Sequence, residues 1–264
     1  MSVERIQRAL ELARLQRAAE HSAAEANVVD EVTQRHPATR VRVDMQRLRE
    51  NRVILPDAQG PAAQAYRMLR TQVLQRVRQY AVRALGVVSA VDGEGKTLTA
   101  ANLAIGIAAE SNQSVLVVDL DLRHPSLATL FGLPVEQGLE AWFAGVASIG
   151  DLCRGIEGID RLEIVPTLAP VRSSSEILAS RRAQDMLLDL KTAQRAGLVI
   201  FDLPPVLLTD DFLTVAPLLD GVVLVATEGI TKRDDITRTR ELLGPVRLLG
   251  TVLNRSSESE KRVY

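Results

Sequence analysis

A glycine-rich loop is the first stretch of this 264-residue sequence whose residue types and spacing could do chemistry. Residues 89–100 read SAVDGEGKTLTA, after an apolar run of strand length and before a helical pattern. In that context the glycines turn backbone N–H groups inward around a phosphate, Lys96 reaches the β- and γ-phosphates, and the Thr97 hydroxyl binds Mg²⁺. The loop therefore predicts a site for Mg-ATP with these contact residues: Asp92, Gly93, Glu94, Gly95, Lys96, Thr97 and Leu98.

Three aspartates stand where two later apolar runs end. Asp119 follows VLVV at residues 115–118, with Asp121 two residues on, and Asp202 follows LVIF at residues 198–201. Side chains alternate along a strand and ligands bind at the carboxyl edge of a parallel sheet, so we expect all three beside the loop. Thr97, Asp121 and Asp202 are predicted to hold Mg²⁺, partly through water. One aspartate of the first pair is expected to accept a proton from an attacking hydroxyl, and the sequence leaves open which one. The predicted catalytic set is Lys96, Asp119, Asp121 and Asp202.

The elements that must position these residues alternate along the chain. Apolar runs of strand length lie between helical patterns at residues 84–90, 114–119, 162–166, 198–202, 221–226 and 247–253. This alternation predicts an α/β fold of the P-loop NTPase type, in which helices cover both faces of a parallel sheet. The domain is expected over residues 61–255.

The two ends of the chain differ from this domain. Residues 1–60 are interpreted as a helical extension, over residues 2 to about 25, followed by a linker with one short extended piece near Val41. Residues 256–264 are expected to form a disordered tail that ends in Tyr264. The domain itself opens with a helix from Pro61, whose apolar stripe is expected to face the core and includes Tyr66 and Tyr80 as packing residues.

Composition limits the possible function classes. A formal charge of −1 gives no overall attraction to nucleic acid, and Cys153 is the only cysteine, so an intrachain disulfide and a cysteine-built metal site are excluded. Apolar runs stay far below the roughly 20 residues of a membrane span, and residues 1–20 lack a signal-peptide pattern. We therefore expect a cytoplasmic protein that reaches the inner membrane only through a partner.

Together the segments SAVDGEGKT, VVDLDLRHP and VIFDLPPVLLTDD resemble the three Walker motifs of the bacterial tyrosine kinases (BY-kinases) of capsule and exopolysaccharide loci. The most specific part is the Asp-x-Asp-x-Arg signature, which ends at Arg123, and the resemblance spans roughly residues 61–255. It implies an ATP-dependent autokinase whose subunits, often in a ring, phosphorylate tyrosines in each other's tails. It also implies an inner-membrane polysaccharide co-polymerase as activator and a cognate tyrosine phosphatase as a further partner.

The resemblance assigns roles to several residues outside the Walker motifs. Tyr264 is the expected phosphoacceptor, and Asn254 is expected to contact the adenine, unless it is only a turn residue at the end of a strand. Gln64, Arg67 and Arg70 occupy the family's Glu-x-x-Arg-x-x-Arg subunit-contact motif. Because an amide replaces its leading carboxylate, a charge-assisted contact between subunits would weaken here.

Two other functions stay open at this point. Partitioning and septum-positioning ATPases share the P-loop and use ATP as a switch, but they usually carry a second lysine where Val91 stands. A weakly active adaptor for the co-polymerase is the third possibility, because the tail offers a single tyrosine.

Overall fold

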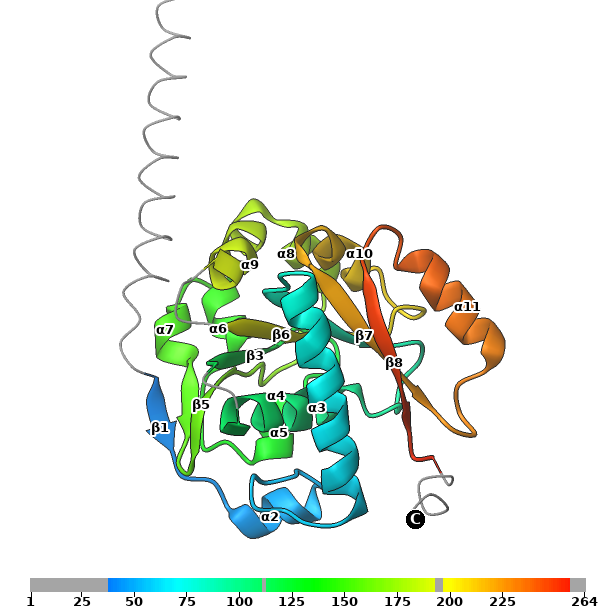
Figure 1. Ribbon diagram of the computed structural model, residues 1–264. Helices are drawn as coiled ribbons and strands as arrows, with labels where there is room; N and C mark the ends of the chain where they lie inside the picture. Colours follow the sequence, from blue (N-terminus) through cyan, green and yellow to red (C-terminus); the bar gives the residue numbers. More distant parts are fainter. Residues whose placement is uncertain (1–37, 111–112, 193–196, 257–264) are drawn as a thin grey trace, which may run out of the picture.

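The computed structural model describes residues 38–110, 113–192 and 197–256. Its centre is an eight-stranded sheet in the order β1-β4-β5-β3-β6-β2-β7-β8 (Figure 1). Neighbouring strands pair in parallel except β4 with β5. The strands are β1 (Thr39–Val41), β2 (Ala84–Ser89), β3 (Val115–Asp119), β4 (Arg154–Ile156), β5 (Ile159–Val165), β6 (Leu198–Asp202), β7 (Gly221–Thr227) and β8 (Leu248–Asn254).

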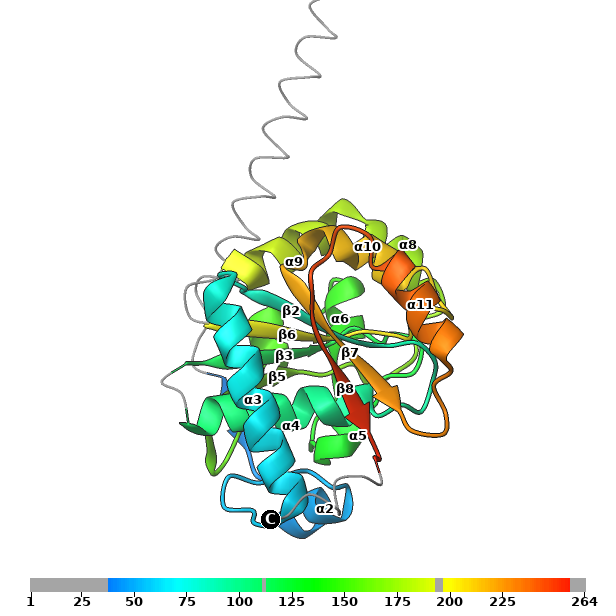
Figure 2. The same cartoon turned by 45° about the vertical axis from the view of Figure 1, so that its right-hand side comes forward.

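Helices cover both faces of the sheet, as Figures 1 and 2 show from two sides. Their bounds are α2 (Met45–Glu50), α3 (Pro61–Gln79), α4 (Lys96–Glu110), α5 (Leu127–Phe131), α6 (Leu139–Phe143), α7 (Ile149–Leu152), α8 (Ser174–Ala179), α9 (Arg181–Thr192), α10 (Asp211–Val215), the 3₁₀ helix η1 (Ala216–Leu218) and α11 (Arg233–Leu242). The predicted fold class is confirmed. None of the described helices combines the length and the apolar character that a membrane span requires.

Two apolar cores explain why the central strands read as continuous hydrophobic runs. In β7, Val222 and Leu224 pack into the core that includes α9, while Val223 and Val225 pack into the core that includes α4. Every residue of β2, β3, β6 and β7 is buried, because each strand has a helical layer on both faces. The six predicted strands are all present, with bounds that shift by a few residues at most.

The linker predicted for residues 26–60 is wrong over residues 38–60. The expected short extended piece is β1, which pairs with β4 at one edge of the sheet. The Asp44 side chain then caps α2 by accepting the Gln46 and Arg47 N–H groups. Val43, Leu48, Val53 and Leu55 are buried in the same core as α4, so this segment gains hydrophobic burial that a solvated linker lacks. The helix predicted over residues 2–25 and the tail with Tyr264 lie outside the described residues.

Fewer residues of helix α3 are buried than its apolar stripe predicts. Val73 and Val77 are buried, but Tyr66 is only partly buried and Tyr80 is 40% exposed. Tyr80 is the C-cap of α3, so the helical periodicity that placed it toward the core has already ended there. Its ring lies instead beneath the Arg247 guanidinium, 4.0 Å from the ring centroid.

Candidate nucleotide-binding site

The glycine-rich loop connects β2 to α4 in the geometry that phosphate binding requires. Gly93 and Gly95 have φ angles of +77° and +83°, which side chains other than glycine rarely adopt. A Cβ atom at Gly95 would also clash with the Asn254 amide nitrogen, so the Asn254 side chain would have to shift to make room for it. Helix α4 begins at Lys96, which directs the unpaired N–H groups of its first turn toward the loop.

Lys96 and the three predicted aspartates meet at the carboxyl edge of the sheet. Lys96 Nζ lies 2.6 Å from Asp121 Oδ2, and Asp119 and Asp202 are neighbours in the pairing of β3 with β6. All three carboxylates are fully buried. A single ammonium group therefore faces three buried carboxylates, an arrangement that favours a bound cation or protonation of a carboxyl group.

The pKa values show this excess of negative charge. Burial lowers the pKa of Lys96, but Asp202, Asp121 and Asp119 outweigh burial and raise it above the ordinary value. Burial is the main cause that raises the pKa of Asp202 to about 6, against the opposing effects of Lys96 and the Thr97 hydroxyl. Burial and the Asp202 carboxylate hold the pKa of Asp119 well above its usual range, although the Leu127 N–H group lowers it.

The two aspartates that follow β3 have different surroundings. Asp119 Oδ2 accepts the N–H groups of Ser126 and Leu127 at the start of α5, and its Oδ1 accepts the N–H group of Asp121. Asp121 uses Oδ1 for the His124 N–H group and presents Oδ2 to Lys96. Asp119 therefore holds the segment between β3 and α5 in place. Asp121 instead has one oxygen that faces the phosphate-binding loop.

The donors beside Thr97 fit a divalent cation. Neither oxygen of Asp202 has a hydrogen-bond partner among the described residues, although the Thr97 hydroxyl is close enough to lower the pKa of this carboxyl group. The Thr97 hydroxyl itself accepts a hydrogen bond from Ser126 at 3.1 Å. Two unpaired buried carboxylate oxygens next to a hydroxyl are ligands that suit Mg²⁺. In the described part of the chain, no group of three His, Cys, Asp or Glu side chains is arranged to hold a metal ion.

Glu94 has a role that the loop pattern did not indicate. Its side chain is fully buried, and Oε2 accepts the N–H groups of Ala90 and Val91 at 2.7 and 3.0 Å. Oε1 accepts the Thr231 hydroxyl, and the Glu94 carbonyl accepts the Thr227 hydroxyl. The carboxylate thus ties the start of the loop to the turn after β7, and only the Glu94 backbone N–H group remains to donate to a phosphate.

Asn254 lies beside the phosphate-binding loop, a position that is compatible with its predicted contact with adenine. Its amide nitrogen donates to the Glu94 carbonyl at 2.9 Å, and its Oδ1 accepts the Arg255 N–H group. A second amide N–H remains for a ligand. The predicted role of Asn254 as a base contact stays a prediction.

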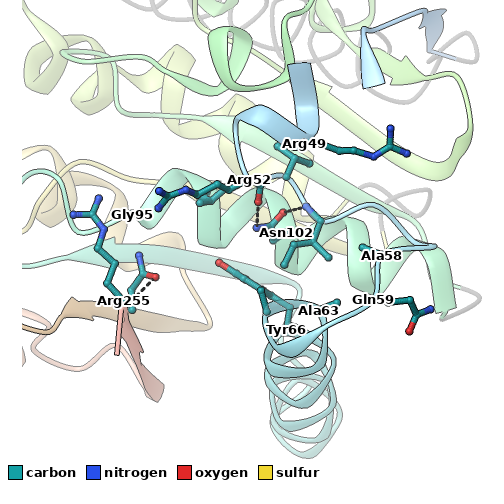
Figure 3. Close-up of a pocket in the computed structure, with 14 residues that line it drawn as sticks. Arg49, Arg52, Ala58, Gln59, Ala63, Tyr66, Gly95, Asn102 and Arg255 are labelled. Atoms are coloured by element: carbon teal, nitrogen blue, oxygen red, sulfur yellow. Dashed lines mark hydrogen bonds between the residues drawn. The ribbon is translucent and has the colours of Figure 1, made fainter. Parts of the chain in front are cut away.

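A pocket of about 400 Å³ continues from the loop along α4 (Figure 3). One side consists of Gly95, Leu98 and Asn102 with the end of β8, and the other of six residues between Arg49 and Gln59 and the start of α3. The full lining is Arg49, Arg52, Val53, Ile54, Ala58, Gln59, Ala62, Ala63, Tyr66, Gly95, Leu98, Asn102, Asn254 and Arg255. The segment interpreted as a linker is therefore part of the candidate site.

Arg123, the last residue of the Asp-x-Asp-x-Arg signature, points toward α8 and α10. Its guanidinium donates to the Ser174 and Ser175 hydroxyls at 3.0 and 3.1 Å and pairs with Asp211 at 3.3 Å. Asp211 is fully buried. The arginine thus anchors the loop that carries Asp121 to the opposite helical layer.

The predicted subunit-contact residues lie on α3, and two of them bind their own chain. Arg70 pairs with Glu110 of α4 at 2.5 Å, and Arg67 donates to the Ala58 carbonyl at 3.3 Å. Gln64 is exposed. The contact of these residues with a second subunit stays a prediction.

Comparisons with known proteins show which proteins this chain is similar to. The tyrosine-protein kinase YwqD of Bacillus subtilis is 27% identical over 220 residues, which is 83% of this chain and 91% of YwqD. The chain is a homologue of the bacterial tyrosine kinases. No protein-family model matches it.

Two further comparisons agree with this relationship. The crystal structure of the chimerical protein CapA2B2 covers 83% of this chain and 94% of its own, with a TM-score of 0.70 and 26% identity. The succinoglycan biosynthesis transport protein ExoP of Rhizobium meliloti is 26% identical over 222 residues, which is 82% of this chain and 28% of ExoP. The BY-kinase resemblance and its P-loop fold, predicted from the sequence, are thereby confirmed.

Proposed function

We propose that the chain is an ATP-dependent protein-tyrosine kinase that transfers the γ-phosphate of Mg-ATP to Tyr264 of a neighbouring copy. The observation that supports this most strongly is the ion pair of Lys96 with Asp121 beside the buried, unpaired oxygens of Asp202. These groups provide a cation for the phosphates, a carboxylate near the reacting atoms and ligands for Mg²⁺. Phosphoryl transfer requires little more from a protein than such positioning and charge.

Each side chain then has a distinct task. Lys96 leaves Asp121 for the more negative triphosphate, which frees Asp121 Oδ2. The phenol oxygen of the acceptor forms a bond to the γ-phosphorus, the bond from that phosphorus to the oxygen that bridges to the β-phosphate breaks, and ADP leaves. The phenol proton passes to Asp121.

Asp121 suits the role of proton acceptor better than Asp119 does. Both oxygens of Asp119 already accept backbone N–H groups, whereas Asp121 Oδ2 faces only Lys96. We therefore assign proton transfer to Asp121 and the Mg²⁺ contacts of the protein to Thr97 and Asp202, which revises the expected metal role of Asp121. When bound, Mg²⁺ would neutralise charge on the phosphates.

The proposed biological role rests on the similarity to named relatives. The relationship to a tyrosine kinase and to a polysaccharide transport protein supports a function in the polymerisation and export of exopolysaccharide or capsule. We propose a homo-oligomer with contacts at Gln64, Arg67 and Arg70, an inner-membrane co-polymerase as activator and a cognate tyrosine phosphatase. We further propose that this partner holds the chain at the cytoplasmic face of the membrane.

The experiment mixes two variants of the purified chain with Mg-ATP and measures phosphate on Tyr264 by mass spectrometry. Lys96→Met cannot transfer phosphate but keeps the acceptor, and Tyr264→Phe keeps the active site but lacks the acceptor. We expect Tyr264 of the Lys96→Met chain to be phosphorylated only when the Tyr264→Phe chain is present.

Three other outcomes would each correct the proposal. Phosphate on the Lys96→Met chain alone would refute the site. Phosphate on wild type but not in the mixture would refute transfer between copies. ATP hydrolysis without any phosphotyrosine would favour the partitioning-ATPase-like switch or the adaptor instead.

A further inference from the structure

We propose that residues 49–59 and Tyr66 form the nucleoside end of the nucleotide site, with Arg52 as the residue that determines affinity for the base and ribose. The inference rests on the proposed use of ATP and adds a ligand role for a segment that lies outside the Walker motifs. The segment was expected to be a linker, so no sequence motif assigns it to the site.

The position of the pocket identifies the portion of the ligand that it takes. Gly95 and Leu98 line it, so it opens directly from the phosphate-binding loop. A nucleotide whose phosphates lie in the loop must place its nucleoside in space that is continuous with the loop. The volume of about 400 Å³ is in the range of small-ligand sites.

The lining of the pocket suits an aromatic base attached to an anion. Among the described residues that line it are three arginines and no aspartate or glutamate. Val53, Ile54 and Leu98 supply apolar surface, and Tyr66 supplies an aromatic ring. Figure 3 shows the Arg52 side chain and the Tyr66 hydroxyl directed to the side of the pocket where Gly95 and Arg255 lie, whereas Arg49 points away. A guanidinium group can stack on a base and donate to its ring nitrogens at the same time.

The backbone of Arg52 is the strongest sign that its side chain has a function. Helix α2 ends in a Schellman motif, because the Val53 N–H group donates to the Leu48 carbonyl and the Arg52 N–H group to the Arg49 carbonyl. In this motif the residue at the position of Arg52 has a left-handed backbone and is usually glycine. Arg52 adopts it with φ at +62°.

The same backbone feature recurs on the opposite side of the pocket. Arg255 has φ at +54°, so two of the four non-glycine residues with positive φ in the described ranges are arginines of this pocket. Strained backbone tends to occur where a side chain has a function. Arg161, which has φ at +61° and does not line the pocket, provides a matched control.

Asn102 fixes Arg52 relative to the phosphate-binding loop. It is buried on α4, the helix that begins at Lys96. Its Oδ1 accepts the Ile54 N–H group at 2.8 Å, and its Nδ2 donates to the Arg52 carbonyl at 3.2 Å, as Figure 3 shows. Both ends of the nucleotide site are thus held by one helix, which makes Asn102 a positioning residue.

The experiment measures the binding of two ligands, Mg-ATP and magnesium tripolyphosphate, by calorimetry. Tripolyphosphate carries the phosphate chain without a nucleoside. We expect Arg52→Gly to bind ATP about tenfold more weakly and to bind tripolyphosphate as wild type does. The melting temperature should stay equal or rise, because glycine adopts a positive φ without strain.

Control variants separate this inference from the proposed function. Arg161→Gly removes an arginine from the same backbone conformation elsewhere and should leave the binding of both ligands unchanged. Lys96→Met should weaken the binding of both. Unchanged ATP affinity in Arg52→Gly, or an equal loss for ATP and tripolyphosphate, would overturn the inference and leave the proposed function intact. Equal binding of ATP to Lys96→Met and wild type would instead overturn the proposed function.

Discussion

The two ends of the nucleotide site are built in different ways. At the phosphate end, Lys96, Thr97 and the three aspartates come from short motifs at the carboxyl ends of adjacent strands. At the nucleoside end, the lining comes from α2 and the loop after it, from α3, from α4 and from the end of β8, and most of it lies outside the Walker motifs. Phosphate chemistry fixes residue types close together in the sequence, whereas a base can be held by any surface of suitable shape and charge.

The two ends also carry opposite charge. Three buried carboxylates face one lysine at the phosphate end, and three arginines without a carboxylate line the nucleoside end. The phosphate end therefore needs a cation that arrives with the ligand, while the nucleoside end can bind without one. Removing Mg²⁺ should accordingly affect the first end more than the second.

The largest expected effect separates the two aspartates of the phosphate end. Asp121→Asn should lower phosphotransfer by about 100-fold or more, because it removes the proposed proton acceptor and keeps the fold. Asp119→Asn should instead lower the melting temperature, since Asp119 holds three backbone N–H groups. Single-turnover rates and melting curves of both variants check this. A larger loss of rate in Asp119→Asn would reverse the assignment.

Glu94 tests whether the phosphate-binding loop is held from inside the protein. Glu94→Ala leaves the buried N–H groups of Ala90 and Val91 without an acceptor and should reduce the free energy of unfolding by about 2–4 kcal/mol. Glu94→Gln retains an acceptor oxygen and should lose less. Denaturant unfolding and the KM for ATP measure both effects. Equal losses in the two variants would show that the charge, rather than the acceptor, is what matters.

Asn102 sharpens the comparison because it connects the two ends. Asn102→Leu leaves the Ile54 N–H group and the Arg52 carbonyl unpaired, and should reduce stability by about 2 kcal/mol. The variant should bind ATP more weakly but keep its affinity for tripolyphosphate. Asn102→Asp, which retains only the acceptor for Ile54, should show an intermediate loss of ATP affinity. Loss of tripolyphosphate binding in the leucine variant would mean that the two ends are not separable.

Asp202→Asn is expected to leave the nucleoside end unchanged and to give a gain in stability that depends on pH. The pKa of Asp202 is about 6 in the folded chain against an ordinary value of 3.8, so the folded state is stabilised when this carboxyl group is protonated. Below about pH 4 the group is neutral in both the folded and the unfolded state, and the variant should match wild type. As the pH rises from about 4 through 6, wild type should lose about 3 kcal/mol relative to the variant, because the folded pKa lies about two units above the ordinary value. Melting temperatures from pH 4 to pH 8 measure this, and a difference that does not depend on pH would contradict it.

Much of the fold could be predicted from the sequence because the central strands are buried on both faces. Runs such as Val222–Val225 must be apolar at every position, which distinguishes them from helices and surface strands. Residues 38–60 gave no comparable signal. Their buried side chains, among them Leu48 and Leu55, are spaced irregularly because β1, α2 and the loop after it each contribute only one or two contacts to the core.

The candidate site could be predicted where a residue type in a short motif points to one kind of chemistry. The Lys96 ammonium and the aspartates at the ends of β3 and β6 are brought together as expected. The inward carboxylate of Glu94 and the two hydrogen bonds of Asn102 depend on partners far away in the sequence, such as Thr231 and Ile54. The left-handed backbone of Arg52 at the end of α2 could not be predicted either, because a Schellman motif is recognised in a sequence by a glycine at this position.

The most direct test of the proposed kinase activity is phosphopeptide mass spectrometry of the C-terminal peptide from cells that are making polysaccharide. Wild type should carry phosphate on Tyr264, and a strain with Lys96→Met in place of wild type should carry none. An unmodified Tyr264 in wild type, or equal modification in both strains, would contradict the account.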